Sequence, residues 1–167
     1  MKINFLVLLL ATLVPLVVGF VWYNPRFGFG KAWMQASGVT EESSRGGNMA
    51  LIFGLTTLFS FFIAFIIQSF VIHQFPVFGL LSQQPDFKTP GSESSELWNN
   101  IYTLYGNSFR TFKHGAFHGA LMGIFLALPI LATNALFERK SFRYIAINAG
   151  YWIVSMSLMG GVICAFS

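Results

Sequence analysis

The chain has 167 residues, of which 54% are hydrophobic and only 10% are charged. A soluble globular domain carries about 25% charged residues, so this composition excludes an ordinary soluble enzyme. The apolar residues occur in long continuous blocks, which excludes a disordered chain and a membrane β-barrel built of short alternating strands. We therefore expect an all-α, polytopic membrane protein that forms a single domain over residues 1–167.

The net charge of +4 comes from ten basic and six acidic residues, and the basic ones are scattered between the apolar blocks. Nucleic-acid-binding proteins gather such residues in one patch, so we expect no nucleic-acid partner. The one cysteine, Cys164, lies in an apolar run. A single cysteine cannot form an intramolecular disulfide, and this position is typical of a small buried side chain.

Four apolar segments are long enough to cross the bilayer, whose hydrocarbon core of about 30 Å takes about 20 residues of helix. They cover about residues 3–23, 49–72, 115–137 and 144–166. Every Asp, Glu, Lys and Arg lies outside these blocks, as expected since a charge at the bilayer centre costs about 2.5–3.5 kcal/mol. We predict four transmembrane helices. The first is interpreted as an uncleaved span because its apolar run exceeds the roughly 7–15 residues of a signal-peptide core.

The basic residues also predict an orientation. Loop one and the short turn between the last two spans hold six of them, whereas the N-terminus and the long second loop hold four. Cytoplasmic loops are enriched in Lys and Arg, so we expect both termini on the opposite, external side. The six are Arg26, Lys31, Arg45, Arg139, Lys140 and Arg143, and the four are Lys2, Lys88, Arg110 and Lys113.

The second loop, residues 73–113, is too long for a plain turn. Its first half is rich in Pro, Gly and Ser and is predicted to be irregular. Its second half places apolar side chains at helical spacing, which predicts an amphipathic helix on the outer surface. These side chains are Leu97, Ile101, Leu104, Tyr105 and Phe112.

The three histidines are the most suggestive chemical feature. His114 and His118 are four residues apart on the third span and therefore share a helix face. His73 ends the second span, which is antiparallel to the third, so all three lie at one membrane boundary. Imidazoles at this spacing can chelate a transition metal. The carboxylates that could complete the shell are Asp86, Glu93 and Glu96.

Other interpretations of the histidines stay open. Two histidines on one helix cannot ligate opposite faces of one haem, so haem would need a ligand from another helix. Imidazole rings also occur at membrane boundaries or inside helix bundles without binding a metal. We therefore predict no cofactor from the sequence, with a metal or haem as the alternative.

Small residues predict close helix packing. Gly115, Gly119 and Gly123 form one stripe on the third span, and such stripes let two helix backbones approach closely in lipid. The tight turn between the third and fourth spans favours a hairpin, with a homodimer as the alternative. The matching small residues on the fourth span are Ala146 and Gly150, and Ser157, Gly161 and Ala165.

Polar residues inside the spans are few. Asn134 and Asn148 flank the short turn and are expected to form a polar clasp across the hairpin. The apolar blocks contain no charged side chain, which argues against an ion-coupled transporter with charges near the midplane. The chain shows no paired carboxylates, no nucleophile with a base and no phosphate-binding loop, so we expect no catalytic residues and no enzyme activity.

Two strings carry a family resemblance: WYNPRFGFGKAWMQASGVT after the first span and ERKSFRYIAINAGYWIVSMSLMGG through the fourth. Physically, the first is an interfacial motif, because Trp and Tyr favour the headgroup level and Asn-Pro ends the helix. Its residues are Trp22, Tyr23, Pro25, Gly30, Lys31 and Trp33. The chain resembles a widespread bacterial family of small four-span inner-membrane proteins classed only as a domain of unknown function.

The resemblance covers most of the chain and implies four spans in a bacterial inner membrane, without an assigned activity. Its further positions are Phe29, Met34, Gly38, Thr40, Glu138, Arg139, Ile147, Asn148, Gly150 and Tyr151. We expect an accessory or structural subunit of a larger membrane assembly, or a homo-oligomer, whose partners are the lipid bilayer and other membrane proteins. One alternative is a metal- or haem-binding redox protein using the histidines, and a second is a small oligomeric transporter or channel.

Overall fold

The computed structural model describes residues 3–40, 42–43 and 47–167, so Lys2 and Arg45 of the orientation argument lie outside the described residues. The fold is all-helical and contains four helices long and apolar enough to cross a membrane, which confirms the predicted fold class. These candidate spans are Phe5–Trp22, Met49–Val71, Phe112–Phe137 and Phe142–Phe166.

The first span is interrupted. Asn4 caps α1 (Phe5–Thr12), and after Leu13 the chain continues as α2 (Val14–Trp22). Pro15 lies in the first turn of α2. Proline has no N–H to donate to the carbonyl four residues earlier, so the break comes where that bond is lost. The short helix α3 (Gly30–Ser37) follows and ends at Gly38, whose φ of 82° is left-handed.

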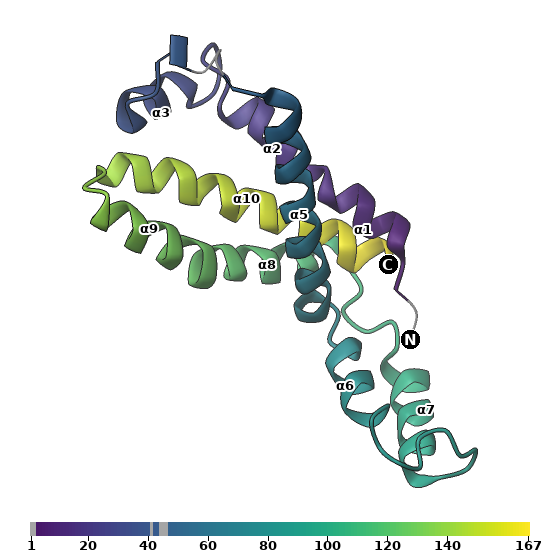
Figure 1. Ribbon diagram of the computed structural model, residues 1–167. Coiled ribbons are helices and arrows are strands. Elements are labelled where there is room, and N and C mark those ends of the chain that lie inside the picture. The colour runs from purple at the N-terminus through teal and green to yellow at the C-terminus, as the bar shows by residue number, and fades with distance from the viewer. Residues whose placement is uncertain (1–2, 41, 44–46) are drawn as a thin grey trace.

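The second span, α5 (Met49–Val71), begins at the N-cap Asn48 and ends where Ile72 becomes extended. The loop that follows contains two helices, α6 (Gln74–Leu81) and α7 (Glu93–Tyr105), which form a hairpin extending away from the bundle (Figure 1). The helix α7 lies where an amphipathic helix was predicted. The prediction of irregular structure is wrong for residues 74–81, which form α6. Proline is tolerated in the first turn of a helix, and Phe78 packs on Trp98 with ring centroids 5.0 Å apart.

The third span comprises α8 (Phe112–Met122), the π-helical turn η1 (Gly123–Ala127) and α9 (Leu128–Phe137). The wide turn precedes Pro129, and the Leu128 N–H donates to the Gly123 carbonyl across it. A π turn of this kind accommodates the hydrogen bond that proline cannot make. The helix starts three residues before the apolar block because Thr111 Oγ1 accepts the His114 N–H and caps it.

The fourth span, α10 (Phe142–Phe166), is the central helix (Figure 1). It starts at the N-cap Ser141 and contacts each of the other spans. Half of its membrane-length window is buried, against 17% for α5, so α10 supplies most of the protein-facing surface. Met159 and Ile163 are fully buried against Leu8 and Ile67, which makes this the core of the bundle.

Glycines set the distance between α8 and α10. A Cβ atom on Gly115 would fall on the Gly160 carbonyl oxygen, and one on Gly119 would fall on the Met156 carbonyl oxygen. On Gly123 it would lie 2.6 Å from Ile153 Cα. The predicted stripe on the third span therefore lies against α10 within the same chain.

Of the small residues predicted on α10, Ser157 lies against α8, where its Oγ donates to the Ala116 carbonyl at 2.9 Å, whereas Gly150 and Gly161 have other neighbours. A Cβ atom on Gly150 would lie 2.9 Å from Trp22 Cζ2, and one on Gly161 would lie 2.6 Å from Phe112 Cε2. The α8 stripe meets the α10 backbone at Ile153, Met156, Ser157 and Gly160, and of these only Ser157 was predicted. Gly150 and Gly161 let aromatic rings, rather than a second backbone, approach α10.

The bundle has two distinct ends (Figure 1). We call one the terminal end: it holds the starts of α1 and α8, the ends of α5 and α10, and the α6–α7 hairpin. Asn4 Nδ2 donates to the Phe166 carbonyl there at 3.3 Å. We call the other the motif end: it holds α3 and the turn between α9 and α10, residues 138–141.

Candidate metal centre

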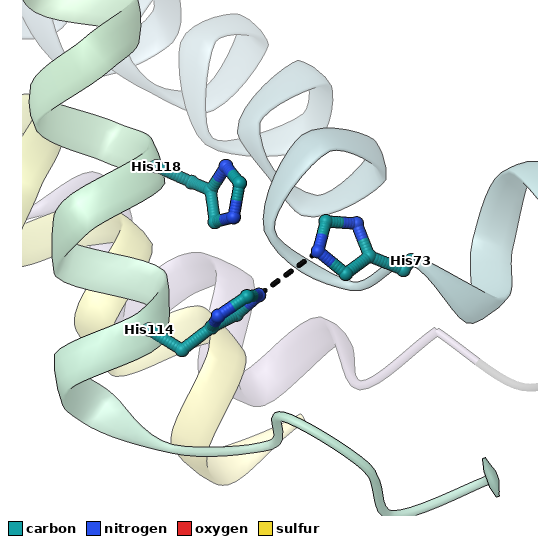
Figure 2. Close-up of side chains that lie close together, drawn as sticks. All are labelled: His73, His114 and His118. Atoms are coloured by element: carbon teal, nitrogen blue, oxygen red, sulfur yellow. Dashed lines mark hydrogen bonds between the residues drawn. The ribbon is translucent and has the colours of Figure 1, made fainter.

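The three histidines meet at the terminal end. His73 lies at the junction between α5 and α6, directly after the extended Ile72. His114 and His118 project from the first two turns of α8, and Figure 2 shows the three rings facing one another. We call these residues the His cluster. The structure thus brings together three side chains that are 45 residues apart at most in a chain of 167.

The ring nitrogens of the His cluster lie at nearly ligating distances. The Nε2 atoms of His73 and His114 are 3.0 Å apart, and one ligand nitrogen from each of the three residues lies within 4.8 Å of the other two. A tetrahedral zinc ion with Zn–N bonds of about 2.0–2.1 Å holds its ligand nitrogens about 3.3 Å apart. Small side-chain rotations would bring all three nitrogens to that spacing, so the residues fit a metal ion.

The donor set suits a borderline transition metal. Neutral imidazoles are typical ligands of zinc, copper, iron and nickel, whereas Mg²⁺ and Ca²⁺ prefer oxygen. His73 is exposed and the other two are half-buried, so an ion can reach them from water. Three protein ligands leave one position of a tetrahedral ion for water or another ligand.

The predicted carboxylate ligands lie elsewhere. Asp86 accepts hydrogen bonds from the Ser94 side chain at 2.8 Å and the Ser94 N–H at 3.2 Å. Glu93 and Glu96 are in the first turn of α7, whose last residue, Tyr105, contacts Gln74 beside His73. A helix rises 1.5 Å per residue, so Glu93 is about 18 Å along α7 from that contact. The α6–α7 hairpin therefore carries these carboxylates away from the His cluster.

Phe109 forms one wall of the His cluster, and sequence reasoning missed it. Its ring stacks on His114 with centroids 5.2 Å apart, and its φ of 62° is left-handed, which is uncommon for a bulky residue. Cys164 Sγ donates to the Phe109 carbonyl at 3.3 Å, and Arg110 Nε donates to the Cys164 carbonyl at 3.0 Å. The end of α10 thus braces a strained loop against the histidines. Such strain occurs preferentially at functional sites.

An apolar groove adjoins the His cluster on the side of α8. Its volume is about 350 Å³, and His118, Phe70 and Met122 are among its lining residues. The π-helical turn contributes Phe125 to the same groove. His118 therefore lies between the water-exposed His73 and a surface of the candidate membrane region.

The interfacial motif lies at the motif end, where it joins α10. Trp22 Nε1 donates to the Ile147 carbonyl at 3.0 Å, and the Tyr23 hydroxyl donates to Asn148 Oδ1 at 2.9 Å. Trp33 packs edge-on against Tyr23 with centroids 5.5 Å apart. Burial of Tyr23, together with the neighbouring Tyr151 and Tyr144, raises the pKa of the Tyr23 hydroxyl, which therefore stays a hydrogen-bond donor. The two strings that carry the resemblance meet in space.

The rest of the motif holds α3 beside α10. A Cβ atom on Gly30 would lie 2.7 Å from the Pro25 nitrogen, so this tight turn requires glycine. Lys31 is exposed, while Lys140 Nζ donates to the Ser37 carbonyl at 3.0 Å. The α3 helix is therefore tied to the turn between α9 and α10.

The predicted Asn134–Asn148 clasp differs from the observed arrangement. Asn148 accepts from Tyr23 and donates through Nδ2 to the Tyr144 carbonyl of its own helix at 2.8 Å. Asn134 is exposed on α9. The reason is geometric: Asn148 faces α2, because two residues at similar distances from a turn need not face each other around their helix axes.

The comparisons with known proteins give one match. The family described as "Protein of unknown function (DUF1761)" matches residues 6–164. This range includes both strings of the resemblance and all four candidate spans, apart from Phe5 at the start of the first and residues 165–166 at the end of the fourth. No curated protein and no solved structure matches the chain. The chain therefore belongs to the DUF1761 family of unknown function.

Proposed function

We propose that this membrane protein binds one divalent transition-metal ion through His73, His114 and His118. The observation that carries the proposal is the convergence of three ligand nitrogens, from two elements, within 4.8 Å of one another. Packing supports it, because the glycine contacts fix α8 on α10 and Phe109 stacks on His114. A bound ion would supply a positive charge and an open ligand position at the membrane boundary.

Metal titration of the purified protein tests this proposal. The protein should carry an affinity tag without histidine, be stripped with a chelator, and be titrated with Zn²⁺ and Cu²⁺ by calorimetry. We expect one ion per chain. His114→Ala and His118→Ala should each weaken binding by about 100-fold or more, since losing even an outer-shell partner costs about 10–100-fold. His73→Ala should retain the weaker chelation of the remaining helical pair.

A matched control is Lys113→Ala, because Lys113 is exposed beside His114 but has no imidazole. It should bind metal as the unaltered protein does. The proposal fails if the stripped protein binds no stoichiometric metal, or if the triple histidine variant binds as tightly as the unaltered chain. An absorbance spectrum of protein from native membranes, before stripping, would show a Soret band if haem is bound instead.

A second candidate function is supported by the outward face of α7. Leu97, Leu104 and Tyr105 are 46%, 70% and 58% exposed on a hairpin that extends beyond the bundle. An exposed apolar stripe of this kind is typical of a protein contact, which fits an accessory subunit of a membrane assembly. Leu104→Glu should then remove a stoichiometric partner from protein purified gently from native membranes, whereas Asn99→Glu, exposed on another face of the same helix, should not.

We also propose that the protein lies in a bacterial inner membrane with the terminal end on the periplasmic side. Supporting this, five described basic residues lie at the motif end: Arg26, Lys31, Arg139, Lys140 and Arg143. The described basic residues of the second loop are Lys88, Arg110 and Lys113. Reporter fusions after Ser167 would test the orientation, because periplasmic and cytoplasmic reporters give opposite readouts.

A further inference from the structure

A second groove lies at the motif end, between α3 and the first turns of α10. Its volume is about 430 Å³, within the usual range of about 300–1,000 Å³ for small-molecule sites. The wall from the first span and its following loop is Trp22 and Phe29, whose rings lie 4.7 Å apart. The wall from α10 is Ala146, Ile147 and Gly150.

The Trp22 wall of the groove is held rigidly against α10. The indole of Trp22 is fixed by its hydrogen bond to the Ile147 carbonyl at 3.0 Å. Gly150 lets that ring approach α10, because a Cβ atom there would lie 2.9 Å from Trp22 Cζ2. The groove is therefore built into the helix contact and does not depend on a loop closing over it.

The two ends of the groove differ in charge and in their depth along α10. Arg143, in the first turn of α10, is the one charged residue among the lining residues. Its Nη1 donates to the neutral Gln35 Oε1 at 3.4 Å. Gly150 lies seven residues further along the helix, which is about 10 Å deeper toward the middle of the span. The groove thus runs from a guanidinium at the boundary to an apolar surface within the candidate membrane region.

We infer that this groove binds one phospholipid with an anionic headgroup. The phosphate would face Arg143, whose planar donors suit phosphate oxygens, and one acyl chain would lie against Trp22 and Gly150. Neighbouring charge favours an anionic over a zwitterionic lipid, because Lys31, Arg139 and Lys140 lie at the same end of the bundle. The site is independent of the His cluster, which lies at the terminal end.

Quenching of tryptophan fluorescence tests this site. Trp22 should be kept and the other three tryptophans, Trp33, Trp98 and Trp152, replaced by Phe. This protein is reconstituted in phosphatidylcholine vesicles, and brominated phosphatidylglycerol or brominated phosphatidylcholine is added in steps. We expect phosphatidylglycerol to quench Trp22 at several-fold lower mole fraction. Arg143→Gln should reduce that preference by about fivefold, the effect of one basic residue near an anionic surface.

Two pairs of variants separate the headgroup from the chain. Ala146→Phe fills the groove from an exposed position, so it should weaken quenching by both lipids, whereas Ala50→Phe, exposed on α5, should not. Lys113→Gln removes a charge at the terminal end and should leave the preference unchanged. Unaltered thermal unfolding of each variant shows that it is folded.

Three outcomes would overturn the inference. Equal quenching by the two lipids would show that the motif end has no anionic site. An unchanged preference in Arg143→Gln would place any anionic site elsewhere. Competition by soluble glycerol phosphate would show a phosphate site that does not require a lipid chain.

Discussion

The two ends of the bundle are built in different ways. At the motif end, side chains of the first span and its following loop bind the backbone and side chains of α10 directly, as Trp22 does to Ile147 and Tyr23 to Asn148. At the terminal end, the His cluster lies on helix starts and junctions, and α10 supports it indirectly, through its packing on α8 and through Cys164 and the loop at Phe109. The motif end is therefore suited to fixed packing, and the terminal end to a site that accommodates an ion.

Both ends of the bundle are held by contacts to α10, but these contacts lie far apart along the helix. Ile147 and Cys164 are separated by about 25 Å of helix. Changes at sites more than about 7–10 Å apart usually have additive effects on stability. Variants at one end should therefore leave the other end's function intact, unless they move α10 itself.

The largest effect is expected from Gly119→Leu, which alters the contact of α8 with α10. The side chain would overlap the Met156 backbone, and overpacking of this kind costs about 1–3 kcal/mol or more. Because α8 carries His114 and His118, the variant should lose zinc binding as well as thermal stability. Calorimetric zinc titration and thermal unfolding in detergent would measure both.

The control is Gly54→Leu on α5, where no heavy atom lies within 4 Å of an added Cβ atom. It should bind zinc normally and unfold at or above the usual temperature, since Leu favours helix more than Gly does. Normal stability and zinc binding in Gly119→Leu would contradict the close packing of α8 on α10.

Tyr23→Phe should have the next largest effect, and only at the motif end. It leaves Asn148 Oδ1 without the hydroxyl donor at 2.9 Å, and an unsatisfied part-buried acceptor costs about 1–3 kcal/mol. The unfolding temperature should fall while zinc affinity stays unchanged. Tyr102→Phe, at an exposed position on α7, should change neither. A drop in zinc affinity with Tyr23→Phe would show that the two ends are coupled.

The sequence predicts the helices and the meeting of the histidines better than it predicts individual side-chain contacts. The four spans follow from apolar length and from the position of charges, and the meeting of three histidines follows from antiparallel helices joined by one loop. Partners that depend on helix rotation were missed: Asn148 binds Tyr23 instead of Asn134, and Gly160 contacts the α8 stripe. The left-handed Phe109 had no signal, because a bulky residue is not the type that favours that conformation.

Cys164→Ala should have a smaller effect at the terminal end. It removes a thiol whose single S–H has two acceptors within reach, the carbonyls of Val71 and Phe109, both 3.3 Å from Sγ. A net loss of about 1 kcal/mol is typical for one hydrogen bond. Phe109 would then hold His114 less firmly, so zinc affinity should fall by a few-fold. Cys164→Ser keeps a hydrogen-bond donor at the same place and should therefore retain most of the zinc affinity. Equal zinc affinity in all three proteins would show that this brace does not position the histidines.

The smallest effect is expected at the tip of the α6–α7 hairpin, where the Ser94 side chain and N–H donate to Asp86 and lower the pKa of its carboxyl. A lowered pKa means that the ionised form stabilises the folded hairpin at neutral pH. That contribution is lost as the pH falls through the lowered pKa, below the ordinary value of about 4. Hydrogen exchange of the first α7 amides should therefore accelerate, relative to the intrinsic rate, on acidification.

Asp86→Asn removes the titrating group and should make that exchange faster at neutral pH and less dependent on pH. The Asp86 side chain is only partly buried, so salt should weaken the effect. Glu93 and Glu96 also lie at the start of α7, where negative charge favours a helix N-terminus, and they stay unchanged in this variant. An unchanged pH dependence in Asp86→Asn would assign it to those glutamates. The hairpin tip would then be stabilised by the helix dipole rather than by the Asp86–Ser94 hydrogen bonds.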